Sequence, residues 1–428
     1  MVEPSTTSER TTHIMSERTG LQRVSRRTAL KRGLLASSAV ALGVSTVSGT
    51  AVAEKISVPD DYSTIQGAVD AAAPGDRVLV NDGTYREQIV VDKDLDLEGK
   101  NATIEHPDSP ASYTIAESSP TWEPTVFAYG GSVSSGAVSG SGTVDVSISG
   151  FTIDGRSVQP DARRKPAILY RNVNSSDKSR IEDNTVEEMG VGGKETFGIL
   201  AYGDTHVAIE GNDVRDYERG GIGANGDGGD HPSPEVTIRD NTVTGSTGIG
   251  EAWGPNGIQV GFGASGTVKR NTVNDNRYSD EDPVASGILV FESDGIVVQK
   301  NEIENADIAL SVGSWGWFRS SADNTKIKDN TVTEAEYGVL MESVAEPYGG
   351  ALTQSDPSVS NTKVLKNDLT GESDPEGQIG VGIIVEDNVD NDYDPVAENN
   401  KIRKNSITNF ATEIEDQGSE TKMDPANP

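Results

Sequence analysis

Residues 181–186 read Ile181-Glu182-Asp183-Asn184-Thr185-Val186, and this pattern of an apolar residue, two intervening residues, Asn, one more residue and a second apolar residue returns along the chain. The repeated asparagines are Asn184, Asn212, Asn241, Asn271, Asn301, Asn330, Asn367 and Asn405. Their spacings are 28, 29, 30, 30, 29, 37 and 38 residues, and an earlier copy at 146–153 has Gly150 at the Asn position. A period in this range with variable insertions is typical of a solenoid.

A second short apolar segment recurs between the Asn motifs. It reads Gly198-Ile199-Leu200-Ala201, Gly257-Ile258-Gln259-Val260, Gly287-Ile288-Leu289-Val290, Gly338-Val339-Leu340-Met341 and Gly382-Ile383-Ile384-Val385. Alternation at period two within each segment predicts strands, and coils this short have room for three strands and no helix.

These repeats resemble the right-handed parallel β-helix proteins of the pectin-lyase-like group, over about residues 58–410. The resemblance implies an all-β fold, a single-stranded right-handed parallel β-helix solenoid with a short N-terminal capping helix. In that group the repeated Asn side chains stack from coil to coil as a ladder of amide hydrogen bonds, so we interpret them as structural.

The flanking segments complete this domain organisation. Ser63 to Ala72 has a capping-box start and an apolar stripe at Ile65, Ala68, Val69 and Ala72, which predicts the capping helix. We expect one β-helix domain over residues 54–410, with a long excursion at 107–145 that is rich in Ser, Gly and Pro. Residues 411–428 read as a polar tail.

The first 53 residues carry an export pattern. Arg26-Arg27 precedes an apolar run from Gly33 to Val47, and Ala51-Val52-Ala53 supplies a small-residue cleavage site. We therefore expect a twin-arginine signal peptide at 1–53 and an extracellular product. The apolar run is too short for a comfortable membrane span, and with no Cys to take a lipid we expect no stable membrane anchor.

The charge balance limits the partners. Asp and Glu number 68 against 36 Lys and Arg, which gives a net charge of −32. Residues 1–53 hold seven of the basic and three of the acidic residues, so the exported chain would carry 29 basic and 65 acidic residues. Such a surface argues against nucleic acid as a partner, and it resembles secreted proteins of salt-loving archaea, which keep their fold only in high salt.

Alternation predicts which residues point outward from the strands of the second segment. They are Leu169, Leu200, Gln259, Leu289, Leu340 and Ile384, followed two residues later by Arg171, Tyr202, Phe291, Glu342 and Glu386. Outward aliphatic side chains are unusual on an acidic protein. Either the insertion loops fold over them, or they form a docking surface for a polymer or a partner.

Aromatic residues in the loops beside this sheet favour a carbohydrate site. Three of the four Trp, namely Trp253, Trp315 and Trp317, lie in these loops. Trp faces stack on sugar rings, so we assign substrate binding to these three with Tyr202 and Phe291; plugging of the loops is the alternative.

Candidate catalytic residues come from the same loops. If the protein is a lyase on a uronate polymer, Arg319 or a Ca²⁺ ion at Asp280 and Asp282 would neutralise the carboxylate, and His231 or Lys194 would remove the proton. If it is a hydrolase, Glu251 would act with an Asp across the scissile bond.

Two functions stay open. The first is an extracellular, monomeric polysaccharide-active enzyme, with a lyase favoured over a hydrolase. The second is a non-catalytic surface or glycan-binding protein. The sequence lacks the signature motifs of pectin methylesterases, polygalacturonases and the commonest pectate lyases. The repeat also resembles the NosD-like copper-accessory group, but the exported chain has three His and no Cys for a copper site.

Overall fold

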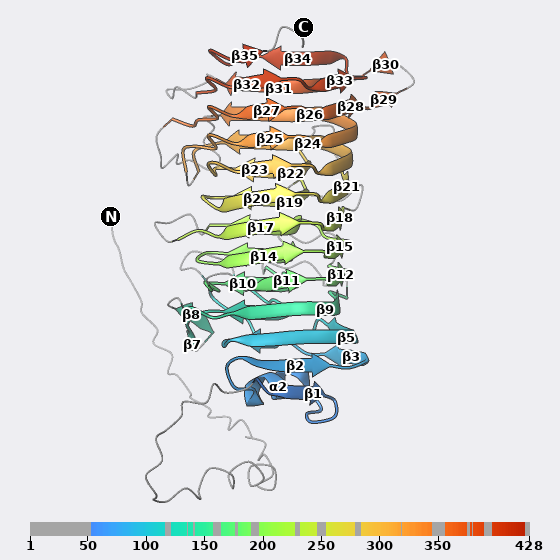
Figure 1. Cartoon of the computed structure of the whole chain (residues 1–428), viewed down its shortest axis with the longest axis vertical. Coiled ribbons are helices and arrows are strands. Elements are labelled where there is room, and N and C mark those ends of the chain that lie inside the picture. The colour runs from blue at the N-terminus through green and yellow to red at the C-terminus, as the bar shows by residue number, and fades with distance from the viewer. Residues whose placement is uncertain are drawn as a thin grey trace, which may run out of the picture. The chain divides into compact units, whose positions relative to one another are not determined.

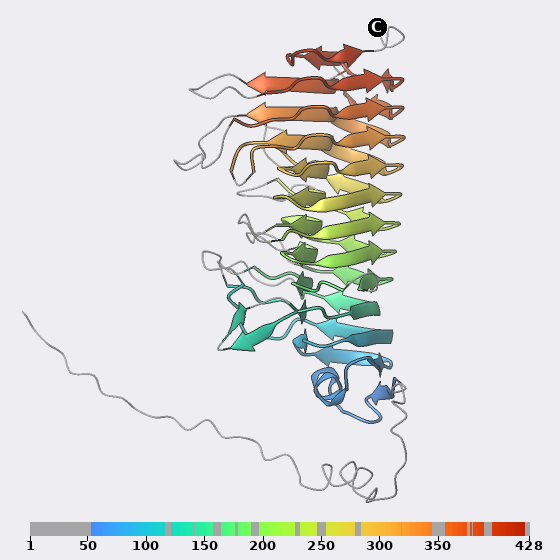
Figure 2. The ribbon, with the colours of Figure 1, turned by 60° about the vertical axis from the view of Figure 1, so that its left-hand side comes forward.

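The strands pair coil upon coil into a parallel stack, which Figures 1 and 2 show from two sides. The computed structural model describes residues 53–423 apart from gaps at 116–120, 135, 140–141, 157–163, 176–178, 190–196, 227–231, 246–253, 279–283, 318, 345–355, 375–376, 379 and 389–395. Each coil contributes one strand to each of three parallel sheets, and the apolar core lies between them.

The first sheet contains the strands that precede the Asn turn. Its members in order are β1 (Lys55–Val58), β2 (Asp76–Val80), the start of β5 (Leu95–Glu105), the start of β9 (Val146–Asp154), β11 (Arg180–Glu182), β14 (His206–Glu210), β17 (Glu235–Arg239), β20 (Ser265–Lys269), β23 (Val297–Gln299), β25 (Lys326–Lys328), β27 (Lys363–Leu365), β32 (Lys401–Arg403) and β35 (Lys422–Met423).

The second sheet follows the Asn turn. Its members are β3 (Gly83–Arg86), the ends of β5 and β9, β12 (Thr185–Glu187), β15 (Asp213–Arg215), β18 (Thr242–Thr244), β21 (Thr272–Asn276), the starts of β24 (Glu302–Ser314) and β26 (Thr331–Val344), β28 (Asp368–Gly371) and β33 (Ser406–Thr408).

The third sheet holds the Gly-initiated strands. Its members are β4 (Ile89–Val91), β6 (Val126–Tyr129), β10 (Ile168–Arg171), β13 (Phe197–Tyr202), β16 (Gly220–Asn225), β19 (Asn256–Gly261), β22 (Ser286–Phe291), the ends of β24 and β26, β31 (Val381–Asn388) and β34 (Thr412–Asp416). The recurring Gly is required by close packing: a Cβ at Gly257 would lie 2.4 Å from Cγ1 of Val273. Two hairpins, β7 (Ser132–Ser134) with β8 (Ala137–Ser139) and β29 (Ser373–Asp374) with β30 (Gly377–Gln378), lie outside the three sheets.

The Asn ladder is present as predicted. Each Asn from Asn184 to Asn367 donates from Nδ2 to Oδ1 of the next Asn at 2.9 to 3.1 Å. The same oxygen also accepts the backbone N–H of the preceding Asn, and these seven side chains are 1% exposed. The residue before each Asn has a positive φ, so the turn is tight and repeated.

The N-terminal cap is also confirmed. Helix α2 (Ile65–Ala71) begins after Thr64, whose side chain accepts the N–H of Gly67, and it buries Ile65, Ala68 and Val69 against the first coils. It lies at the N-terminal end of the stack (Figure 1), where it covers strand edges that would otherwise be open.

The structure differs from the sequence analysis at two boundaries. Residues 107–145 are not one excursion, because β6 pairs with β4 and β10 and buries Val126 and Ala128 in the core. The coils also continue past Phe410, since β34 pairs with β31 and β35 with β32. In the described part of the chain, no helix has the length and apolar content that crossing a bilayer requires.

Candidate functional site

The outward residues of the third sheet stack in columns along the axis of the coils. In one column Asn225, Gly261, Phe291, Gly313, Glu342 and Glu386 are register partners on successive strands. In the next column the partners are Gly223, Gln259, Leu289, Ser311, Leu340 and Ile384. The alternation predicted from the sequence therefore places these side chains on one face.

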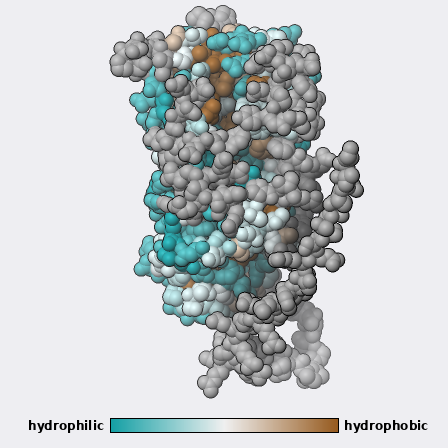
Figure 3. All heavy atoms as spheres, turned by 180° about the vertical axis from the view of Figure 1, so that it is seen from behind, coloured by the Kyte–Doolittle hydropathy of each residue, from teal (hydrophilic) through white to brown (hydrophobic). Residues whose placement is uncertain are grey.

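A groove of about 510 Å³ runs over this face from β19 to β31. Aliphatic side chains on its floor include Leu289, Ile308, Leu340 and Ile384. Seen from the side opposite Figure 1, a hydrophobic strip lies near the C-terminal end of a mostly hydrophilic stack (Figure 3). A concave, largely apolar surface with a few polar groups is the usual form of a ligand site.

Aromatic rings form one wall of the groove. Phe291 lies edge-on to both indoles, with centroid distances of 5.7 Å to Trp315 and 5.5 Å to Trp317. The centroids of the two indoles are 5.0 Å apart, with an interplanar angle of 85°, and the Phe262 ring packs 5.4 Å from that of Phe291. Perpendicular packing fixes each ring against its neighbour, so the wall presents rigid aromatic surfaces at little entropic cost.

A buried carboxylate holds the segment that carries the two indoles. Glu292 is 0% exposed, and its Oε1 accepts the backbone N–H of Trp317 at 2.7 Å while Oε2 accepts that of Arg319 at 2.9 Å. Because it follows Phe291 with a φ of +48°, its side chain reaches this segment from the end of β22. One residue thus positions Trp317 beside Phe291.

Two carboxylates lie side by side at the C-terminal end of the groove. Glu342 on β26 and Glu386 on β31 are direct register partners, and both line the groove. Burial, and secondly the nearby Glu415, raises the pKa of Glu386 above its ordinary value. Tyr337, which also lines the groove, has a pKa raised by burial and by Glu336.

Neutral amides occupy the other end. Gln259 donates from Nε2 to Oδ1 of Asn225 and accepts the Nδ2–H of Asn256, each at 3.0 Å. All three side chains are under 8% exposed. Arg219 lines the groove near them and donates to the carbonyl of Gly254.

The N-terminal part of the same sheet is covered. Leu169, Leu200 and Tyr202 pack with Tyr113, Ile115, Trp122, Phe127, Tyr129 and Phe197 in a separate apolar cluster. Tyr202 lies 5.3 Å from Trp122, and the guanidinium of Arg171 lies 5.0 Å from the Tyr202 ring. The covering of the outward aliphatic side chains is thus confirmed for Leu169 and Leu200, while Leu289, Leu340 and Ile384 line a groove, where docking of a polymer or a partner stays a prediction.

The predicted site residues divide into three groups. Phe291, Trp315 and Trp317 come together in the groove. Tyr202 lies in the N-terminal cluster, and Arg319 is not among the groove-lining residues; a Cβ at Gly263 would lie 3.0 Å from its Nε. The remaining predictions, at Lys194, His231, Glu251, Trp253, Asp280 and Asp282, lie outside the described residues.

The loop that carries the predicted Ca²⁺ ligands has defined ends. Asp307 accepts the backbone N–H of Tyr278 at 2.9 Å and that of Ala285 at 3.3 Å, so one carboxylate closes the loop at both sides of residues 279–283. Among the residues that the structure describes, no group of three or more His, Cys, Asp or Glu could hold a metal ion.

Several groove residues were not predicted as site residues from the sequence. Glu342 and Glu386 were placed outward but were not paired, although aligning Gly338 with Gly382 puts them in register. Phe262, Tyr278 and Tyr337 also line the groove. In the sequence, only the distance of such residues from the repeated Gly could have indicated that they line the groove.

Comparison with known proteins supports the architecture. The family model described as a right handed beta helix region matches residues 168–387. A polygalacturonase from Erwinia carotovora ssp. carotovora superposes with a TM-score of 0.53 at 12% identity, covering 86% of this chain and 96% of that chain. No curated protein sequence matches the chain.

Two further solved structures are similar at lower scores. The A-module of a mannuronan C-5 epimerase from Azotobacter vinelandii gives a TM-score of 0.44 at 15% identity, covering 87% of this chain and 100% of that chain. A surface adhesin of Streptococcus pneumoniae gives a TM-score of 0.47 at 14% identity, covering 85% of this chain and 93% of that chain. At these identities the likeness concerns the fold alone.

Proposed function

The chain belongs to the right-handed β-helix family, and from that premise we propose that it is a secreted protein that binds an extracellular polysaccharide in the groove of the third sheet. One observation carries the proposal: Phe291, Trp315 and Trp317 gather on the same groove as a line of amides and carboxylates. Aromatic faces pack against the apolar faces of sugar rings, and amides and carboxylates pair with hydroxyl groups. The fold shared with a polygalacturonase is in keeping with such a ligand.

The charges that line the groove favour a neutral polymer. Glu342 and Glu386 lie at one end, and Arg219 is the one cation among the described lining residues. A uronate chain would bring further carboxylates beside Glu342 and Glu386, which costs free energy in a partly buried site. Elimination on a uronate polymer, with Arg319 or Ca²⁺ as the neutralising charge and His231 as base, stays a prediction from the sequence.

Binding to a panel of neutral and acidic glycans tests the proposal. The titrations would be followed by intrinsic fluorescence in molar NaCl, the condition that the acidic composition favours. We expect at least one neutral glycan to bind, and we expect Trp317→Ala to weaken that binding about tenfold or more, as for other buried aromatic anchors. The matched control is Trp122→Phe, which alters a Trp in the N-terminal cluster and should leave the affinity unchanged. Absence of binding across the panel would refute the proposal.

A second candidate function is hydrolysis of the bound glycan. It is favoured by the register pair of carboxylates, because the raised pKa of Glu386 suits a general acid and its neighbour Glu342 could activate water. In this step Glu386 gives its proton to the glycosidic oxygen, the bond to the anomeric carbon breaks, and water adds there while Glu342 takes its proton. We expect Glu386→Gln to abolish release of reducing ends and to leave glycan binding intact. If the wild-type protein binds a glycan and releases no ends, the binding function alone stands.

A further inference from the structure

The first sheet concentrates positive charge on an acidic protein. On strands β20 to β35 the inward residues Val268, Val298, Ile327, Val364 and Ile402 are at most 1% exposed, so the residues on either side of each point outward. The strands lie one above another in the C-terminal half of the stack (Figure 1). We define this outward surface, with the turn residue before each Asn, as the basic face.

Cations on the basic face stack in register. Lys326, Lys363, Lys401 and Lys422 are successive register partners in one column. The parallel column contains Lys269, Lys328 and Arg403. The turn positions, which also follow one another from coil to coil, hold Arg270, Lys300, Lys366 and Lys404.

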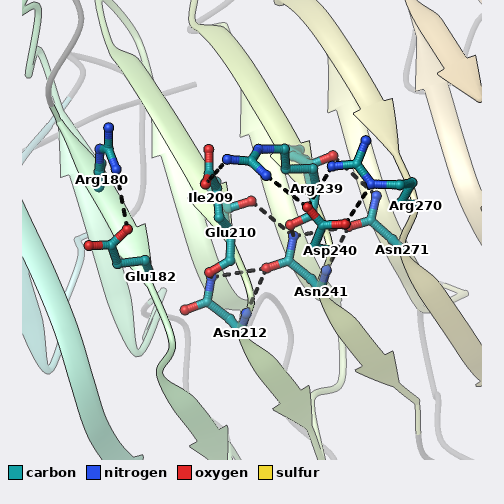
Figure 4. Close-up of polar contacts among 11 residues, drawn as sticks. Arg180, Glu182, Ile209, Glu210, Asn212, Arg239, Asp240, Asn241, Arg270 and Asn271 are labelled. Carbon is teal, nitrogen blue, oxygen red and sulfur yellow. Dashed lines mark hydrogen bonds and ion pairs between the residues drawn. The ribbon is translucent and has the colours of Figure 1, made fainter.

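The basic face therefore holds eleven of the 29 basic residues of the exported chain, and among the described residues of the same three columns one is acidic, Asp329. Two of the eleven have ion-pair partners: Lys328 with Asp329 at 3.1 Å and Arg270 with Asp240 at 2.7 Å. Within the described part of the chain, the other nine make no ion pair. Figure 4 shows the contrast on the preceding coil, where Arg239 binds both Glu210 and Asp240; Arg270, the first turn residue of the basic face, shares Asp240 with it.

This arrangement does not serve stability. Like charges on neighbouring strands, about 4.8 Å apart, repel one another, and exchanging alternate Lys for Glu would remove the repulsion. The cations form a regular row along the axis of the coils, and most of them are unpaired. Such a row matches a linear polyanion that lies along the same axis and carries one negative charge on each monomer.

We propose that the basic face binds an anionic polysaccharide with a carboxylate on each sugar, aligned with the axis of the coils. Each exposed Lys–carboxylate pair contributes little, so affinity depends on many pairs formed together. The net charge of the protein does not prevent this: the face spans five interstrand steps, about 24 Å, whereas charge is screened beyond about 8 Å at physiological ionic strength.

The chemistry of the face favours a polysaccharide over a nucleic acid. The remaining described members of the three columns are Thr267, Val297, Gln299, Leu365 and Asp329, and they offer no aromatic ring on which a base could stack. The basic face and the groove are separate sites, because they lie on different sheets and the face favours an anionic ligand whereas the groove favours a neutral one.

The test compares polygalacturonate with its methyl-esterified form, by calorimetry at the lowest NaCl concentration that keeps the native circular dichroism spectrum. We expect the acid polymer to bind at least tenfold more tightly than the ester, with affinity falling as salt rises. The double variant Lys363→Glu/Lys401→Glu should weaken binding of the acid polymer at least tenfold. The variant Lys363→Gln/Lys401→Gln should weaken this binding by a smaller factor. Trp317→Ala should leave it unchanged, which separates this site from the groove.

The matched control is Lys55→Glu/Lys100→Glu, which makes the same change in net charge at exposed lysines of the N-terminal coils. Equal binding of acid and ester, or equal loss in the control, would overturn the proposal. So would tighter binding of a 20-nucleotide oligodeoxythymidylate, which would assign the face to nucleic acid. Self-association at low salt that the Lys363→Glu/Lys401→Glu variant abolishes would assign it to a second copy of the chain.

Discussion

Oε1 of Glu292 accepts the backbone N–H of Trp317 at 2.7 Å, across 25 residues of chain and at the edge of the aromatic groove. The carboxylate is fully buried and accepts a second N–H from Arg319. We expect Glu292→Ala to destabilise this region by roughly 3 kcal/mol, because two part-buried hydrogen bonds to a charged acceptor are lost. Amide exchange at Trp317 should quicken, and glycan affinity should fall with it.

The control for this prediction is Glu334→Ala. Glu334 also has a positive φ, but its side chain is exposed. If the cost came only from placing Ala at a positive φ, both variants would lose the same amount of stability. Unchanged exchange at Trp317 in Glu292→Ala would show that other contacts position the indoles.

The interior of the Asn ladder should be more sensitive than its surroundings. In Asn271→Ala the coil loses the amide bonds to Asn301 and to the carbonyl of Ile238, and Asn241 loses its acceptor. Leaving these groups buried and unpaired should cost about 3 kcal/mol, measured as a lowered urea midpoint. Asn274→Ala, on the same coil but pointing outward, should change the midpoint little.

The sequence predicts the coils well because each coil carries its own local pattern. The Asn turn, the inward Val or Ile on either side and the Gly-initiated strand recur, and a repeat that buries its face only on its neighbours must stack them in register. For the same reason, alternation along the strands is enough to predict that Phe291, Glu342 and Glu386 share one face.

The features that could not be predicted are formed by segments outside the repeated strands and turns. Trp122 and Tyr113 cover Leu169 and Leu200 through contacts between segments without periodicity, so no pattern indicates which coils are covered. Glu292 resembles any other acidic turn residue in the sequence, and its role depends on a loop that closes 25 residues later. The predicted boundary at Phe410 was wrong because Ile414 is the one apolar residue of β34, which is too weak a signal to predict a strand that packs on the core.

Acid should destabilise the N-terminal coils through His106. Burial, and secondly Lys165, lowers the pKa of His106 to about 4, and its Nδ1 lies 2.8 Å from Oγ1 of Thr125. Between pH 6.5 and about 4 the unfolded chain binds a proton that the folded chain does not, so stability falls as pH falls, by about 3 kcal/mol in total. In His106→Asn the change in unfolding midpoint between pH 7.5 and pH 4 should shrink accordingly. An NMR titration of His106 near pH 6.5 would contradict this.

Glu386 should have the opposite dependence on pH. Its folded-state pKa is raised by burial and then by Glu415, so the folded chain holds the proton over a range where the unfolded chain has lost it. This residue therefore favours folding below its unfolded pKa of about 4.5, and that contribution is lost as pH rises through the folded value. We expect Glu386→Gln to raise the melting temperature relative to wild type at pH 7.5, with the difference vanishing near pH 4. Glu415→Gln should narrow the pH range over which the folded chain holds this proton and the unfolded chain does not, because removing the charge of Glu415 lowers the folded-state pKa of Glu386. A difference between Glu386→Gln and wild type that is the same at both pH values would show that Glu386 ionises as it does in water.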